Sequence, residues 1–147
     1  MAAWIEPKED EIAAIVRSAR FVAVVGMKDE QDPAAPAYTV PARMRELGIR
    51  TIGVNPKLAG ALSTLKQLKE APDVIQVFRR SDSIGPLADE IIAMPQATRP
   101  KVVWLQSGIV NVSAAMKLET AGMRVVMDRC FAVELAKHGA PVVPANP

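Results

Sequence analysis

The sequence of 147 residues predicts an α/β fold in which five parallel strands form one doubly wound sheet with helices on both faces. Three observations support this prediction. Five short apolar runs lack the polar alternation of a half-exposed strand, as expected for strands that are buried on both faces. Segments with apolar residues at helical spacing separate most of these runs, which favours βαβ units with right-handed crossovers. Glycine or an Asn-Pro pair ends several of the elements.

The strands are expected where β-branched and other apolar residues are densest, at residues 20–25, 49–54, 73–78, 101–105 and 123–127. The first run reads RFVAVV and is the most apolar, and we therefore place it in the centre of the sheet. The strand order that we favour is 3-2-1-4-5. Asn55 and Pro56 end the second strand, because proline cannot donate a hydrogen bond to a central ladder.

Helices are expected at residues 7–19, 37–47, from 81 onwards, 111–122 and 131–138. The second helix tolerates Pro41 because this residue falls in its first turn, and Ser81 is expected to cap the third. Residues 58–68 form an irregular link with one helical turn. We expect a single domain over residues 1–147, with a core from about 20 to 138 and a loose proline-rich tail at 139–147.

Composition argues against several classes of function. Eighteen lysine and arginine residues face 16 acidic ones, and no basic cluster carries stacking aromatic residues, so that nucleic acid is not an expected partner. No apolar run approaches the ~18 residues of a membrane helix and no signal peptide is visible, so that we expect a cytoplasmic protein. Cys130 and His138 are the only cysteine and histidine, which argues against a disulfide, a metal site and histidine catalysis. We therefore expect no catalytic residues.

Positive side chains follow four of the five expected strands. Ligands of open parallel sheets bind at the carboxyl ends of the strands, where helix N-termini also favour phosphate. The cations that follow the strands are Lys28, Lys57, Arg79 with Arg80, and Arg129. One such residue is more often a solvated loop charge, but four at one edge favour an anion site for more than one phosphate.

The usual dinucleotide fingerprint is absent. Gly26 is the only glycine of its loop, whereas G-x-G-x-x-G needs three glycines around the pyrophosphate. Asn55 also stands where an NAD site usually has an acid for the ribose hydroxyls. Both facts count against NAD, although an NAD(P)-binding oxidoreductase module remains an alternative.

Several further residues have two interpretations each. Tyr38, which opens a helix beside Gly26, either hydrogen-bonds the ligand or covers the core. One of the two neighbours Arg79 and Arg80 is expected to face the ligand, while the other pairs with an acid such as Asp82. Glu134 and His138 lie one helical turn apart and are expected to form a solvated pair.

Cys130 is expected at a helix N-terminus beside Arg129, a setting that lowers a thiol pKa. It is either an inert, buried thiol or the reactive group of a thiol-based redox regulator, which is a third possible function.

At these residues the chain resembles the small stand-alone CoA-binding proteins, which are relatives of the nucleotide-binding domain of succinyl-CoA synthetase α subunits. The resemblance covers most of residues 20–138. It is carried by FVAVVG (21–26), PAYTV (36–40), GIRTIGVNPK (48–57), DVIQVFRRSD (73–82), KVVWLQSGIVN (101–111), AGMRVVMDRC (121–130) and Glu134. As a set at this spacing, these runs are highly specific.

The resemblance implies a Rossmann-like fold that binds coenzyme A or an acyl-CoA, a small nucleotide cofactor, without chemistry of its own. It points to no particular protein partner. Carried over by position, the implied contacts are Gly26, Met27 and Lys28 at the pyrophosphate; Asn55, Pro56 and Lys57 at the ribose phosphate; Phe78, Arg79 and Arg80 at the adenine; and Gln106, Ser107, Gly108, Arg129 and Cys130 along the pantetheine arm. Lys28 and Ala37 depart from the family, which usually has a small hydroxyl residue and a serine there, and this affects the expected affinity more than the fold.

Overall fold

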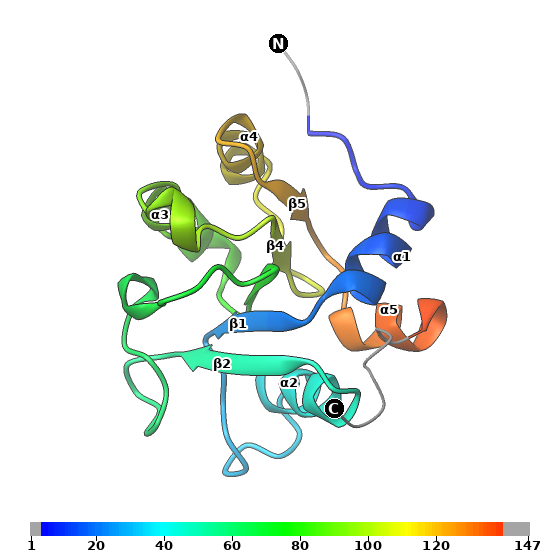
Figure 1. Ribbon diagram of the computed structural model, residues 1–147, viewed down its shortest axis with the longest axis vertical. Coiled ribbons are helices and arrows are strands. Elements are labelled where there is room, and N and C mark those ends of the chain that lie inside the picture. The colour runs from blue at the N-terminus through cyan, green and yellow to red at the C-terminus, as the bar shows by residue number, and fades with distance from the viewer. Residues whose placement is uncertain (1–3, 140–147) are drawn as a thin grey trace.

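The computed structural model describes residues 4–139 and has the expected α/β architecture, with one five-stranded parallel sheet (Figure 1). Its strands are β1 Phe21–Val25, β2 Arg50–Val54, β3 Val74–Val77, β4 Val102–Leu105 and β5 Arg124–Val126. Each of them lies within, or coincides with, a run that the sequence analysis assigned to a strand. The doubly wound, Rossmann-like class is therefore confirmed.

The strand order is β2-β1-β3-β4-β5, so that the expected order 3-2-1-4-5 is wrong in the position of the third strand. β3 lies between β1 and β4, and β2 forms an edge. Burial explains the difference. All four residues of β3 are buried, whereas β2 begins with the exposed Arg50 and the half-buried Thr51 and Ile52. The more polar strand takes the edge, where one side of its backbone needs no neighbouring strand.

Five helices cover the two faces of the sheet (Figure 1). They are α1 Glu9–Ser18, α2 Pro36–Glu46, α3 Ile84–Ile92, α4 Val112–Thr120 and α5 Phe131–His138. Residues of α1, α2 and α5 form one buried cluster, with Trp104 and Phe131 in edge-to-face contact at its centre. α3 and α4 pack on the opposite face around Ile75, Leu105 and Leu118. The central strands thus pack against helices on both sides, which is why their sequences are almost entirely apolar.

The link between β2 and β3 contains the expected helical turn, a 3₁₀ turn η1 at Leu65–Gln67. Thr64 and Gln67 form a reciprocal capping box at its start. The expected loose tail at 139–147 lies outside the described residues, apart from Gly139, which ends α5 as expected. Within residues 4–139, no helix combines the length and apolar character needed to cross a membrane.

Candidate functional site

The backbones of the loops after β1 and β3 approach each other closely at Gly26. Gly26 follows β1 with φ +81°, and its amide donates to the carbonyl of Val54 at 3.0 Å. A Cβ atom on Gly26 would come within 3.0 Å of the Phe78 carbonyl oxygen, closer than such atoms approach in proteins. Only glycine fits both the backbone conformation and this close approach. In the observed order, this point is also where the strand order reverses, the usual ligand position in such sheets.

The loops after β1 and β2 are tied to each other. The side chain of Asn55 donates to the carbonyl of Met27 at 3.0 Å and accepts the amide of Lys57 at the same distance. The Met27 side chain packs against the α1/α2/α5 core cluster, and its Cε lies 2.6 Å from where a Cβ of Gly53 would stand. Asn55 and Met27 therefore shape the loops here.

Pro41 also contributes to the position of the β1 loop. It lies inside α2, beyond the first turn where we expected it, because the helix begins at Pro36. Proline has no N–H to donate to the carbonyl four residues earlier, which is that of Ala37. The amide of Lys28 donates to this carbonyl instead, at 3.1 Å. The carbonyl that Pro41 leaves without a helical donor thereby fixes the loop that carries Lys28. The side chain of Lys28 itself is exposed. Tyr38 is half-buried in the first turn of the same helix.

The loops after β3, β4 and β5 form a second linked group. Ser81 does not cap α3 as expected: it begins a short 3₁₀ turn, and its hydroxyl accepts the amide of Val110 at 3.1 Å. Asp128, which has a positive φ of 58°, accepts the amide of Gly108 at 2.7 Å. Ser107 and Gly108 are exposed at this part of the rim.

A cavity of about 430 Å³ opens beside the point where the strand order reverses. Val25 and Val54, the last residues of β1 and β2, line its base, and Pro56 of the predicted site lines it as well. Its polar lining includes the guanidinium-bearing Arg79, the carboxylates Asp82 and Glu90, and three hydroxyl side chains. A volume of this size matches a small-molecule site. Its lining thus combines one cation with two acids, three hydroxyls and several apolar side chains.

The two neighbouring arginines differ in their contacts, and the expected pairing of one of them with Asp82 is present. Arg80 pairs with Asp82 at 3.2 Å, and both side chains are largely exposed. Arg79 lines the cavity and is exposed, and its Nε lies 3.6 Å from the place of a Cβ on Gly26. Lys57 is exposed on the neighbouring loop. Phe78 packs partly against the α1/α2/α5 core cluster.

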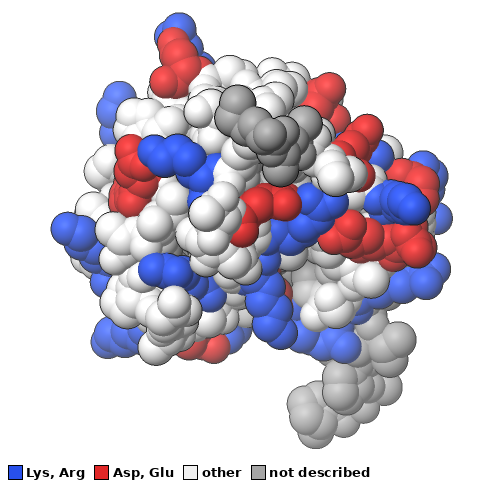
Figure 2. All heavy atoms as spheres, turned by 90° about the horizontal axis from the view of Figure 1, so that it is seen from above, with Lys and Arg blue, Asp and Glu red and all other residues white. Residues whose placement is uncertain are grey.

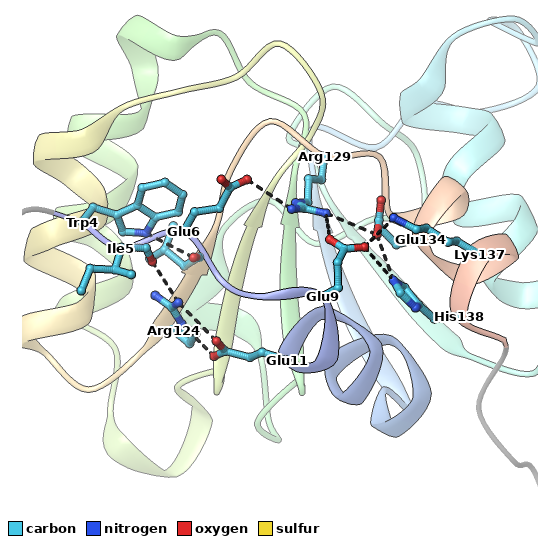
Figure 3. Close-up of polar contacts among 11 residues, drawn as sticks. Trp4, Ile5, Glu6, Glu9, Glu11, Arg124, Arg129, Glu134, Lys137 and His138 are labelled. Atoms are coloured by element: carbon cyan, nitrogen blue, oxygen red, sulfur yellow. Dashed lines mark hydrogen bonds and ion pairs between the residues drawn. The ribbon is translucent and has the colours of Figure 1, made fainter.

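Arg129 lies in a network of ion pairs with the N-terminal segment (Figure 3). Its guanidinium contacts Glu6 at 3.2 Å, Glu9 at 2.8 Å and Glu134 at 3.5 Å, and its side chain is 19% exposed. Although burial alone would lower the pKa of Arg129, these carboxylates raise it overall. Hydrogen bonds from Lys137 and Arg129 hold the pKa of Glu9 at about 2. Arg129 is thus already engaged by three carboxylates, in contrast to Arg79.

Glu134 and His138 do not form the expected solvated pair. Glu134 is buried, and His138 Nε2 lies 3.4 Å from a carboxylate oxygen of Glu134 and of Glu9. The helical spacing correctly placed the two side chains on one face of α5, but Glu9 comes from α1 and covers them (Figure 3).

Acidic and basic side chains are intermixed on the face shown in Figure 2, which therefore carries no extended surface of one charge sign.

The end of β4 holds a buried polar pair that the sequence analysis recognised only in part. Gln106 of the predicted site is 6% exposed, and its Oε1 accepts a hydrogen bond from the side chain of Gln76 at 3.3 Å. Gln76 is completely buried in β3. A glutamine inside the apolar run DVIQVF was the signal for this pair. Cys130, next to Arg129, is half-buried and precedes α5.

Comparison with known proteins decides the family. The family described as the CoA binding domain matches residues 20–136. This chain belongs to that family. The Bacillus subtilis protein YneT, which is uncharacterized, is 34% identical over 132 residues, or 86% of this chain and 93% of YneT.

Solved structures agree with this CoA-binding-domain fold. A Thermus thermophilus protein, 35% identical, superposes with a TM-score of 0.81 over 90% of this chain and 99% of its own. A hypothetical protein from Pyrococcus horikoshii OT3 superposes with a TM-score of 0.77 over 93% of this chain and 98% of its own, at 22% identity. At that identity the likeness supports the fold alone. Ala37, which departs from the usual family pattern, is buried in this chain, and its backbone carbonyl accepts the hydrogen bond from the Lys28 amide.

Proposed function

We propose that this protein binds coenzyme A or an acyl-CoA at the carboxyl-terminal rim of its sheet and carries out no reaction on it. The observation that carries the proposal is the cavity beside Gly26, which Arg79 lines and which lies where the strand order reverses. Membership of the CoA-binding-domain family supports a ligand of this class. The proposed contacts are the rim residues of β1, β2, β3 and β4, with Arg79 on a phosphate group.

The distribution of cations supports a particular division of the site. Lys28, Lys57 and Arg79 have exposed side chains on the loops that follow β1, β2 and β3, and Arg79 lines the cavity, whereas the guanidinium of Arg129 is engaged by carboxylates. We therefore assign phosphate binding to the first three residues and a structural part to Arg129. Because these three cations are exposed, salt is expected to weaken binding.

The position of the only histidine supports binding without catalysis. His138 lies between Glu9 and Glu134 on α5, and its side chain is 14% exposed. Its imidazole is thus enclosed by α1 and α5 and does not line the cavity. The proposed role is therefore to hold the cofactor, with any acyl chemistry performed by another protein.

Isothermal titration with coenzyme A tests the proposal. The wild-type protein is expected to bind, and Arg79→Gln is expected to weaken binding about 10- to 100-fold, since a hydrogen bond to a charged group contributes about 1.5–3 kcal/mol. Arg80→Gln is the matched control, because Arg80 is exposed, pairs with Asp82 and does not itself line the cavity, and a change below about threefold is expected. Absence of binding at millimolar coenzyme A would refute the proposal. An equal loss in both variants would show that the cavity is not the nucleotide site.

A further inference from the structure

Three side chains of types that bind metal ions meet between α1 and α5 (Figure 3). Glu9 is the first residue of α1, while Glu134 and His138 lie one helical turn apart on one face of α5. One carboxylate oxygen or ring nitrogen of each residue lies within 4.8 Å of those of the other two. None of the three residues lines the cavity, so that the proposed binding of coenzyme A gives them no part.

The imidazole of His138 has a buried nitrogen, Nε2, without a hydrogen-bond partner among residues 4–139. This nitrogen lies 3.4 Å from one oxygen of Glu9 and 3.4 Å from one oxygen of Glu134. The side chain of Glu134 is only 8% exposed, and the hydrogen bond that it accepts from Arg129 is long, at 3.5 Å. Buried polar groups of this kind cost stability unless a further group binds them. Both side chains are therefore available to a ligand between them and Glu9.

The separation of 3.4 Å fits two ligands of one metal ion better than it fits a hydrogen bond. A hydrogen bond from a ring nitrogen to a carboxylate is usually about 2.7–3.2 Å long. Bonds of about 2.1 Å to a tetrahedral zinc ion place neighbouring ligand atoms about 3.4 Å apart. The distances from His138 to Glu9 and to Glu134 both have this value. Imidazole with carboxylates is also a ligand set of zinc, whereas magnesium and calcium prefer oxygen ligands.

Two cations next to the cluster determine what a metal ion has to replace. Lys137 contacts Oε1 of Glu9, the same oxygen that faces His138, and its side chain is 55% exposed. It can turn into solvent at little cost, because exposed ion pairs contribute little to stability. Arg129 instead binds Oε2 of Glu9 at 2.8 Å, as a hydrogen-bonded partner of a metal-ligating carboxylate would. Arg129 also binds Glu6, so that three carboxylates face two cations and one negative charge remains in excess.

The geometry points to a site for one divalent transition-metal ion of the zinc class, held by Glu9, Glu134 and His138. A metal ion in this site joins α1 to α5. The sequence analysis argued against a metal site because the chain has one cysteine and one histidine. Here the histidine is supplemented by two carboxylates, one of which comes from the opposite end of the described chain. The site is separate from the cavity, so that its failure would leave the proposed function unchanged.

Isothermal titration of the untagged, metal-free, full-length protein with zinc chloride tests the inference. The wild-type protein is expected to bind one zinc ion per chain, and His138→Gln is expected to bind it at least about tenfold more weakly, since it removes a ligand. Lys137→Gln keeps the three ligands and removes the competing cation, so that it is expected to bind zinc about two- to fivefold more tightly. Unchanged or weaker binding in Lys137→Gln would contradict the inference. Magnesium chloride is expected to give no binding.

The thiol of Cys130 is the other zinc ligand to be tested, because it is half-buried near the same network. Cys130→Ser is expected to bind zinc as wild type does, and a loss of binding in this variant would overturn the inference.

Nuclear magnetic resonance of the wild-type protein gives a second readout that needs no folded variant. Because His138 is the only histidine, its imidazole nitrogen resonances are assigned without ambiguity. Zinc is expected to shift the Nε2 resonance. Unchanged imidazole resonances at millimolar zinc, or the absence of zinc binding by the wild-type protein, would overturn the inference.

Discussion

Replacing Gly26 with alanine is expected to destabilise the protein more than an equivalent replacement at a similar backbone conformation. Gly26 and Gly122 have φ values of +81° and +99°, so that alanine is strained at both. A Cβ at Gly122 would meet nothing within 4 Å, whereas at Gly26 it would come within 3.0 Å of the Phe78 carbonyl oxygen. The two positions therefore share the conformational cost and differ in the steric one.

The magnitude follows from this difference. A non-glycine residue at positive φ costs about 1–2 kcal/mol, and this cost applies to Gly122→Ala. In Gly26→Ala the added overlap forces the β1 and β3 loops apart, and overpacking of this kind costs a further ~1–3 kcal/mol. With a gap of about 2 kcal/mol and roughly 2–4 °C per kcal/mol for a chain of this size, Gly26→Ala is expected to melt about 4–8 °C below Gly122→Ala.

Urea denaturation followed by circular dichroism measures the gap directly, and titration with coenzyme A adds a functional readout. Gly122 lies in the turn between α4 and β5, and its replacement is expected to leave binding unchanged. Gly26→Ala is expected to weaken binding as well, because the loops that it separates carry Lys28 and Arg79. Equal stability of the two variants would refute the argument from the Phe78 carbonyl.

Three further predictions concern the N-terminal segment and the core. Because Lys137 and Arg129 hold the pKa of Glu9 at about 2, below its ordinary value of 4.5, its contribution to stability is fully present above about pH 4.5 and is lost as the pH falls toward 2. The difference in unfolding free energy between wild type and Glu9→Gln, measured in urea, is therefore expected to shrink from pH 6 to pH 2.5, and a constant difference would contradict this. Arg124→Gln is expected to lower the unfolding free energy by about 1–3 kcal/mol, because the Arg124 side chain is only 24% exposed and binds Glu11, Glu119 and the Ile5 carbonyl. Arg43→Gln is the control, because it breaks an exposed ion pair with Glu46. It is expected to change the unfolding free energy by no more than about 0.5 kcal/mol in the same assay. Trp104→Phe is expected to cost about 2–4 kcal/mol, since it removes the 2.8 Å bond to the Arg129 carbonyl and leaves a void in the core. Trp4→Phe loses only a 3.3 Å hydrogen bond to the Val125 carbonyl of β5. Equal losses of unfolding free energy in the two tryptophan variants would therefore be inconsistent with this explanation.

Features that depend on neighbouring residues could be predicted from the sequence. The strands follow from local apolar runs, and the end of α5 follows from Gly139. The ion pair between one of the two neighbouring arginines and Asp82 was also foreseeable, because Asp82 lies two residues from Arg80 along the chain.

Contacts between distant segments could not be predicted in the same way. Arg129 was counted among the cations of an anion-binding rim, and the resemblance placed it along the pantetheine arm. Its partners Glu6 and Glu9, however, precede it by more than 100 residues and meet it only because α1 packs against α5. Serine is a residue type that often caps helices, yet the Ser81 hydroxyl accepts a hydrogen bond from the amide of Val110 in the loop after β4. In both cases the residue type indicated the kind of interaction, an ion pair or a hydrogen bond to an amide. The partner residue could not be predicted, because it depends on the packing of segments that are distant in the sequence.

The strand order has the largest consequence for the site. In the expected order, the reversal would lie between the first and fourth strands, and Gly26 would face Gln106 directly. In the observed order β3 lies between them, so that Gly26 meets Phe78 and Arg79 at the reversal, and Gln106 is one strand further along the rim. The same residues are thereby spread over a longer path, with Arg79 beside the cavity at one end and the glutamine pair toward the other. A compact mononucleotide would use only the first part of this path. A ligand with a phosphorylated head and a long amide-containing arm would use all of it, which is why the corrected topology strengthens the argument for coenzyme A.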